Sequence, residues 1–390
     1  MPVALDRFKK AFGAKVSKDL VKARDSKVDE ALKALKDEAA ALKKLGFDTE
    51  QMEGKYAELT KRRTDANKIK DNDEQYKALE SVKNEAREAV EHSKALSKAA
   101  KDVMGKSTDA PDDTKKTAIY KKALEDLYKL KIKIPDGMTT AHLDKFFDMM
   151  GEVPKSHVAQ DKMKKLTYKT DPDYGGAYGG AEIIMGDFGE AKGEEDYEID
   201  GEVIPANSFN VTTLHEIGHS IDDKKNIMKS NMAKAGCGNW VSETEATIAD
   251  VYVDALRADA AVPDTVTDGE LQGIVMDALG GTVASPTGMD TDIWDSIEPW
   301  LNDNCLTIRS DANPWNNAPV IVAGRVYQEA YGGEWWSYDP AARGTTKVND
   351  YQWRSPWEWF AEVYAISWLA KKKPPSGVDS SVAEYMWKGK

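Results

Sequence analysis

The sequence TLHEIGHSI occupies residues 213–221 and contains the pattern His-Glu-x-x-His. Residues four apart lie on the same face of an α-helix, so His215 and His219 can point the same way. Two imidazoles one turn apart can bind a single Zn²⁺ ion. Glu216 can then act as general base on a water molecule whose pKa the metal lowers. The stretch therefore predicts a zinc-bearing helix, and the alternative is a buried helix with two satisfied histidines.

The length of 390 residues suggests two or three domains with a sizeable core. No apolar run is long enough to span a membrane, so we expect no membrane span. The first twenty residues lack the apolar region of a Sec signal peptide. We therefore expect a protein that is cytoplasmic in its producer, or exported by a signal-peptide-independent route. Cys237 and Cys305 are too few for a disulfide framework, and we expect buried thiols in preference to a pair.

The charge is distributed unevenly along the chain. Residues 1–150 contain 33 Lys+Arg and 28 Asp+Glu, whereas residues 151–390 contain 21 and 39. All eleven tryptophans lie at or after Trp240. These differences predict two modules, residues 1–108 and 109–390, with residues 109–150 compatible with either. The acidic second half argues against a nucleic-acid partner, because phosphate contacts need clustered Lys and Arg.

Residues 1–108 are rich in Ala, Lys, Glu and Leu, and they predict an all-α helical bundle or antiparallel coiled coil of about three helices. Gly46 and the run Asp71–Asp73 mark the breaks between these helices. The apolar residues form two narrow stripes, Val28, Leu32, Leu35, Ala39 and Leu42, and Tyr76, Leu79, Val82, Ala86 and Val90. The bundle is interpreted either as a docking, delivery or targeting module for a delivery or immunity partner, or as a hairpin that only holds itself together.

Residues 109–390 predict a mainly α domain with a small β-sheet, which gives the whole chain an α+β fold. The expected helices cover about 115–132, 140–150 and 242–258. A short strand is expected at 181–186, and another strand or a hairpin arm at 197–204. An edge strand before the His-Glu-x-x-His helix can pair with an extended peptide substrate. His142 and His157 are expected to be structural or exposed. The acidic run 290–295 is expected to be surface and not a calcium loop.

Two histidines leave zinc short of its usual three protein ligands. One major variant of the pattern has Gly and His where this chain has Asp222 and Lys225, so that variant is excluded. The third ligand should therefore be a carboxylate from another helix, and Glu245 and Glu358 both fit. Each also lies in a helix-capping sequence, Ser-x-x-Glu, which is the structural alternative.

Three further features surround these candidates. Pro356 suits the first position of a helix, on which Glu358 and Glu362 would share a face. One of these two carboxylates can bind zinc while the other accepts the N–H of a ligand histidine. Asp222, three residues after His219, can orient a ligand histidine or be a solvated carboxylate near the helix end.

The combination of His215-Glu216-x-x-His219 with Glu358-Trp-Phe-Ala-Glu362 resembles the zinc site of anthrax lethal factor-type metallopeptidases, within the gluzincin group. The resemblance implies that Glu358 is the third ligand. It also implies that Tyr351, seven residues earlier, faces the metal and takes part in catalysis. Asp222-Asp223 match the family pattern as well. The separation of the two motifs is longer than in the family, which keeps Glu245 as an alternative.

The sequence thus predicts a zinc-dependent endopeptidase, a hydrolase that cleaves peptide bonds in a protein or peptide substrate. One Zn²⁺ would be held by His215, His219 and Glu358. Glu216 would transfer the proton, and Tyr351 would donate a hydrogen bond to the developing oxyanion. The resemblance further implies a bacterial toxin or translocated effector. Two other interpretations are a non-catalytic helical binding protein with an inactive zincin-like domain, and a cytosolic housekeeping peptidase.

Overall fold

The computed structural model describes residues 15–107, 109–133, 139–171, 173, 175–186, 193–260, 262–305, 321–330, 333–345, 348–370 and 374–388. The chain divides into two compact units, Met1–Thr170 (unit 1) and Asp171–Lys390 (unit 2). Helices and small sheets together make it an α+β protein, as predicted. Within the described ranges, no helix is both long enough and apolar enough to cross a membrane.

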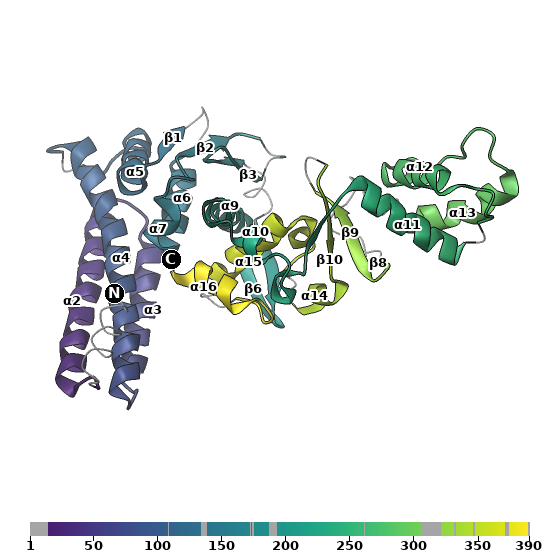
Figure 1. Cartoon of the computed structure of the whole chain (residues 1–390). Helices are drawn as coiled ribbons and strands as arrows, with labels where there is room; N and C mark the ends of the chain where they lie inside the picture. The colour runs from purple at the N-terminus through teal and green to yellow at the C-terminus, as the bar shows by residue number, and fades with distance from the viewer. Residues whose placement is uncertain are drawn as a thin grey trace. The chain divides into compact units, whose positions relative to one another are not determined.

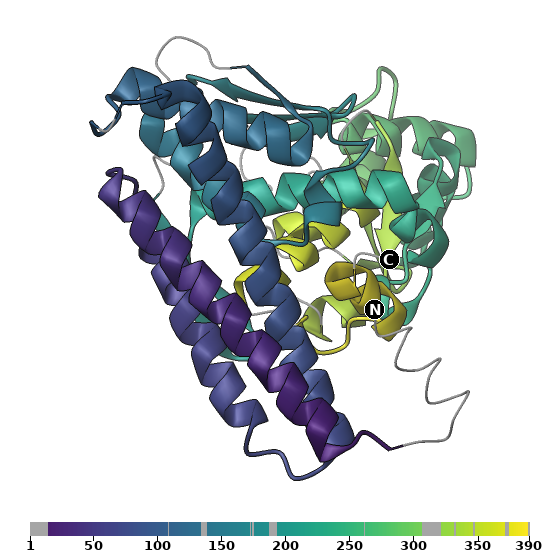
Figure 2. The same cartoon turned by 90° about the vertical axis from the view of Figure 1, so that its left-hand side faces the viewer.

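The described part of unit 1 includes three long helices that lie side by side in Figures 1 and 2, namely α2 (Lys18–Lys44), α3 (Glu50–Ala66) and α4 (Asn72–Met104). The side chains of Ser17 and Asp71 cap α2 and α4 by accepting backbone N–H groups. The predicted stripe of α2 is buried along its whole length, from Val28 to Leu42. The predicted three-helix region is therefore confirmed, because the apolar seam gives each helix a face to bury.

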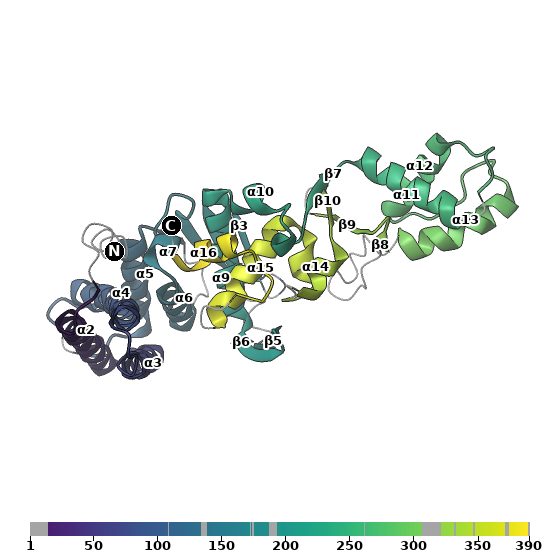
Figure 3. The ribbon, with the colours of Figure 1, turned by 60° about the horizontal axis from the view of Figure 1, so that its bottom comes forward.

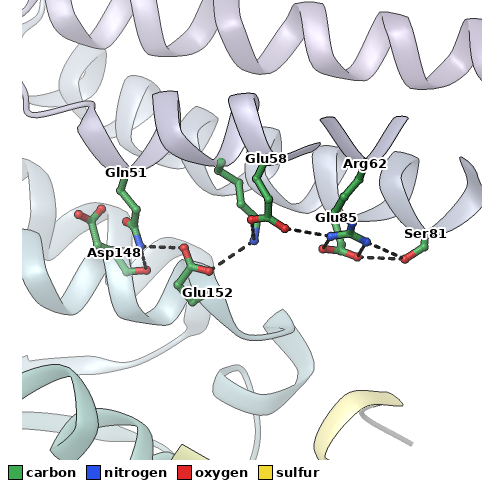
Figure 4. A network of polar contacts seen from close by, with 8 residues as sticks. Gln51, Glu58, Arg62, Ser81, Glu85, Asp148 and Glu152 are labelled. Atoms are coloured by element: carbon green, nitrogen blue, oxygen red, sulfur yellow. Dashed lines mark hydrogen bonds and ion pairs between the residues drawn. The ribbon is translucent and has the colours of Figure 1, made fainter. Parts of the chain in front are cut away.

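The rest of unit 1 comprises α5 (Asp113–Tyr128), β1 (Lys131–Lys133), α6 (Thr140–Glu152), α7 (Lys155–Val158) and β2 (Lys165–Lys169), with β1 and β2 paired in parallel. The Tyr128 hydroxyl of α5 donates to the Met150 carbonyl oxygen at 3.0 Å and contacts His92 of α4. Gln51 of α3 donates to Glu152 of α6 at 2.8 Å, in the network of Figure 4. These contacts tie α5 and α6 to the bundle.

The division into units therefore falls after Thr170, whereas the sequence placed it after residue 108 and left 109–150 open. The linker composition around residue 108 marks only a local break in the helices. Tertiary packing of α5 and α6 against α3 and α4 decides which unit they join.

The described part of unit 2 contains three small antiparallel arrangements of strands, together with helices. β3 pairs with β4, β5 pairs with β6, and β7, β10, β9 and β8 form a four-stranded sheet in that order. The elements are β3 (Gly176–Gly179), β4 (Glu182–Gly186), β5 (Glu194–Ile199), β6 (Glu202–Asn207), α9 (Ser208–Lys225), α10 (Ile227–Asn231), η1 (Ala235–Cys237), β7 (Val241–Glu243), α11 (Glu245–Asp259), α12 (Asp268–Leu279), α13 (Thr291–Asn304), β8 (Ile321–Val322), β9 (Arg325–Glu329), β10 (Trp335–Tyr338), α14 (Pro340–Thr345), η2 (Tyr351–Arg354), α15 (Pro356–Leu369) and α16 (Ser380–Lys388).

The helices α11, α12 and α13 lie at one end of unit 2, away from α9 and α15 (Figures 1 and 3). They have a core of their own, which includes Tyr252, Leu271 and Ile297. Asp290 accepts the N–H of Asp292 and thereby caps α13. The acidic run 290–295 therefore begins a helix, and Asp290, Asp292 and Asp295 are exposed, as expected of acidic surface.

Candidate metal centre

Helix α9 carries the His-Glu-x-x-His pattern. The Asn207 side chain caps it by accepting the N–H of Phe209 at 3.0 Å. Most of the helix is buried, which explains why apolar residues flank the histidines on both sides. His215 and His219 lie one turn apart, and their Nε2 atoms approach to 2.9 Å. The predicted convergence of the two imidazoles on one point is therefore present.

Helix α15 packs directly on α9 and brings the carboxylates to the histidines. Ser355 caps α15 by accepting the N–H of Glu358 at 3.2 Å, and Pro356 begins it, as the sequence predicted. The two helices cross closely at Gly218. A Cβ at Gly218 would lie 3.0 Å from the Ala361 Cα and 3.3 Å from Tyr364. The glycine inside the pattern thus permits the approach that joins the two motifs.

Glu358 completes a compact group with the two histidines. Its Oε2 lies 3.1 Å from Nε2 of His215 and 3.2 Å from Nε2 of His219. A tetrahedral zinc ion about 2.0 Å from each ligand atom separates those atoms by about 3.3 Å. These three residues are the one group in the described parts of the chain whose His, Cys, Asp or Glu ligand atoms could hold a metal. The donor set and its spacing fit zinc.

The pKa values of this group follow from burial opposed by the partners. Burial acts to raise the pKa of Glu358, but hydrogen bonds to His215 and His219 outweigh it and hold the pKa well below its usual value. Burial acts to lower the pKa of His215, but Glu362 and Glu358 outweigh it and raise the pKa well above 6.5. The histidine and the carboxylate therefore shift each other's pKa in opposite directions.

Glu362 and Asn349 support the group from behind. Oε1 of Glu362 lies 2.9 Å from Nδ1 of His215, although the ring N–H does not point straight at it. The Asn349 side-chain amide donates to Oε2 of Glu362 at 2.7 Å. Glu362 therefore lies where the sequence placed it, behind a histidine. Asn349 was not predicted, because it belongs to neither motif and only its position before η2 offers a hint.

Glu216 is buried beside the histidines and lines a cavity of about 610 Å³ together with His215, His219, Tyr351 and Glu358. Burial raises the pKa of the Glu216 carboxyl, and its Oε2 has no hydrogen-bond partner among the described residues. Gly176 of β3 packs against it, since a Cβ there would lie 2.8 Å from Oε1 of Glu216. A carboxylate so placed can exchange a proton with a molecule in the cavity.

Tyr351 lines the same cavity, and its ring centroid lies 5.9 Å from that of His215. The Arg354 guanidinium lies over the Tyr351 ring at 5.5 Å. Other tyrosines of unit 2 pack elsewhere: Tyr338 lies against Trp240 and Trp353, and Tyr327 belongs to the core of α11–α13. Tyr331 lies outside the described residues. The geometry therefore places Tyr351 beside the candidate ligands, in the same cavity.

Other predicted residues lie in different settings. Asp222 lines the cavity, but its carboxylate accepts the N–H of Met228 at 2.7 Å and so caps α10. Glu245, the alternative third ligand, is exposed at the start of α11 and is not part of the metal-binding group.

Several minor expectations can also be placed. His157 is buried on α7 of unit 1, and His142 lies on α6. Cys237 and Cys305 are buried free thiols, as expected. Burial raises the pKa of each thiol to about 12.

No protein-family model, curated protein or solved structure matches the chain. The resemblance to lethal factor-type peptidases therefore rests on the two sequence motifs alone.

Proposed function

We propose that unit 2 is a zinc-dependent endopeptidase. The observation that carries the proposal is the convergence of His215, His219 and Glu358 on one point, with ligand atoms 2.9–3.2 Å apart. A zinc ion bound there would polarise the carbonyl of a peptide bond and make a water molecule more acidic. The chain's own residues supply the rest of the chemistry.

Glu216 is proposed to accept a proton from the attacking water and to return it to the leaving amine. Its burial, its raised pKa and the unpartnered Oε2 support this role. Tyr351 is proposed to donate a hydrogen bond to the oxygen on which negative charge develops. Its position in the same cavity as Glu216 and Glu358 supports that assignment.

The strand β3 is proposed to hold the substrate. Among the described residues, β3 pairs with β4 alone and so has a free edge, and Gly176, Ala177 and Tyr178 line the cavity. An extended peptide that adds to such a strand gains main-chain hydrogen bonds without a demand on its side chains. This arrangement favours a protein or peptide substrate over a small molecule. The further proposal of a toxin or translocated effector rests only on the sequence resemblance.

The test combines metal analysis with cleavage of a panel of denatured proteins, with and without a chelator. We expect about one zinc per chain and cleavage that stops when the chelator is added. Glu216→Gln should keep the zinc but lower the activity about 10²–10⁴-fold, because it removes only proton transfer. Zinc binding without cleavage would point to an inactive zincin-like domain, and absence of zinc binding would reject the proposal.

A further inference from the structure

Asn349 uses both ends of its side-chain amide. Its Nδ2 donates to Oε2 of Glu362 at 2.7 Å, and its Oδ1 accepts the N–H of Gln352 at 2.9 Å. In return, Oε1 of the Gln352 side chain accepts the N–H of Val348 at 2.8 Å. These two side-chain-to-backbone hydrogen bonds stabilise the start of η2, the turn that carries Tyr351.

We propose that Asn349 is a positioning residue that aligns two parts of the candidate active site at once. Through Glu362 it fixes the carboxylate that faces Nδ1 of His215. Through the N–H of Gln352 it fixes the turn that directs Tyr351 into the cavity. This inference deepens the proposed function and rests on it for the role of Tyr351, whereas its effect on metal affinity can be measured without any catalysis.

The amide group suits this task for a chemical reason. Glu362 is 7% exposed, and a buried carboxylate needs donors for its oxygens. The backbone N–H of Gln352 needs an acceptor on the opposite side. An amide offers one donor end and one acceptor end, and these neighbours fix which end faces which. Aspartate would keep the acceptor but lose the donor, and alanine would lose both.

Ligand histidines depend on the partner of their second nitrogen. That partner sets the tautomer and the ring orientation, and its loss typically costs about 10–100-fold in metal affinity or activity. Asn349 does not contact the histidine itself; it acts through its hydrogen bond to Glu362. We therefore expect Asn349→Asp to weaken zinc binding by about 10-fold, at the lower end of that range.

The decisive experiment exchanges donor and acceptor between the two partners. Asn349→Asp should weaken zinc binding, because it places two acceptors face to face. Glu362→Gln should also weaken it, because the single oxygen of the new amide cannot accept from Asn349 and face Nδ1 of His215 at the same time. The double variant Asn349→Asp/Glu362→Gln restores a donor facing an acceptor and keeps the total charge. Its zinc affinity should return to within about 3-fold of the wild type, a coupling typical of residues in contact. Competition with a chromophoric chelator measures the affinities, and the visible spectrum of the Co²⁺-loaded proteins reports the coordination geometry.

The Tyr351 arm uses turnover at saturating zinc. Asn349→Ala should lower kcat about 10-fold more than Asn349→Asp, because only alanine removes the acceptor for Gln352. This 10-fold difference in kcat between Asn349→Ala and Asn349→Asp should vanish when each substitution is made separately in a Tyr351→Phe background. A residue with a merely structural role would give the same ratio with and without the tyrosine hydroxyl.

Asn67 provides a matched control. It also donates to a carboxylate, that of Asp25 at 3.0 Å, but it lies in the helical bundle. Asn67→Asp should leave zinc affinity unchanged. The proposal is overturned if Asn349→Asp binds zinc as the wild type does. It is also overturned if the double variant does not recover zinc affinity. If Asn349→Asp does not fold, the double variant alone decides the question. If the wild-type protein binds no zinc, the proposed function itself fails, which is a separate outcome.

Discussion

Helices α6 and α15 each shield a carboxyl group from solvent, partly at Asp148 and almost fully at Glu358, and the two carboxyl groups ionise in opposite ways. On α6, partial burial together with the charges of Asp144 and Asp48 raises the pKa of Asp148 to about 8. On α15, hydrogen bonds to the histidines outweigh burial and keep the pKa of Glu358 well below its usual value. The comparison teaches that burial alone favours a neutral acid, and that a basic partner is needed to keep a carboxylate charged.

The surroundings of the two helices explain the contrast. Asp148 has acidic neighbours, and the cations of that region, such as Lys55, pair with Glu152 and Glu58. Glu358 faces His215 and His219 across the close crossing of α15 and α9. Only the second arrangement gathers two imidazole nitrogens and a carboxylate oxygen around one point, and such a set of electron-pair donors suits a metal ion.

The largest expected effect comes from removing the carboxylate of α15. Glu358→Ala leaves two histidines, so zinc affinity should fall by orders of magnitude and activity should be lost. Glu245→Ala is the matched control, because Glu245 is exposed on α11 and should not affect zinc. Zinc content after dialysis decides the question. Full occupancy in Glu358→Ala with loss in Glu245→Ala would transfer the third ligand to Glu245.

The next effect concerns Tyr351. Tyr351→Phe removes one hydrogen-bond donor and almost no volume, so kcat should fall by about 10²–10³ while zinc stays bound. Tyr338→Phe is the control, because its hydroxyl accepts from Arg343 at 2.9 Å in the packed core. Steady-state kinetics on one peptide substrate gives both values. Equal kcat in Tyr351→Phe and the wild type would assign Tyr351 to packing.

A smaller effect is expected for the carboxylate behind His215. Glu362→Ala should weaken metal binding or activity by about 10–100-fold, because the ligand histidine loses the partner that orients it. Chelator competition measures the change. A loss as large as that of Glu358→Ala would make Glu362 a ligand, and no loss would make it a packing residue.

The comparison can be sharpened on α6 by titration. Because the folded pKa of Asp148 is raised to about 8 from an ordinary 3.8, the folded state holds a proton that the unfolded state has released. This group therefore contributes stability below about pH 4 and loses that contribution as pH rises to about 8. Asp148→Asn should melt at a higher temperature than the wild type at pH 9 and at the same temperature near pH 4. Equal melting temperatures at both pH values would contradict the raised pKa.

The smallest effect is expected at a surface ion pair of the bundle. Lys33 and Asp37 lie 2.6 Å apart on α2, with side chains 75% and 62% exposed. Water and salt screen such a pair, so Lys33→Ala should change the melting temperature by about 1 °C or less. Zinc content should not change. A shift of many degrees, measured by thermal unfolding, would mean that the bundle depends on its surface charges.

The sequence predicted the parts of the site that depend on local spacing. The helical repeat predicted the positions of His215, Glu216 and His219. The sequence Ser355-Pro356 predicted the start of α15. The contribution of Asn349 was not predictable, because it depends on how η2 folds back on α15. The boundary after Thr170 was missed for a similar reason, since Tyr128 and His92 meet only through tertiary packing. Periodicity describes one element at a time, and these contacts join several.

The separation of the two halves of the candidate metal centre along the chain has a consequence for the order of folding. His219 and Glu358 meet although 139 positions separate them. Closing a loop of that length costs about 4 kcal/mol of chain entropy, beyond a constant term. Helices α11–α13 lie inside this loop and have a core of their own. If they form first, they shorten the flexible span that remains to be closed. A zinc ion bound between α9 and α15 would then tie the ends together, so hydrogen exchange in those two helices should slow on metal binding while exchange in α11–α13 changes little.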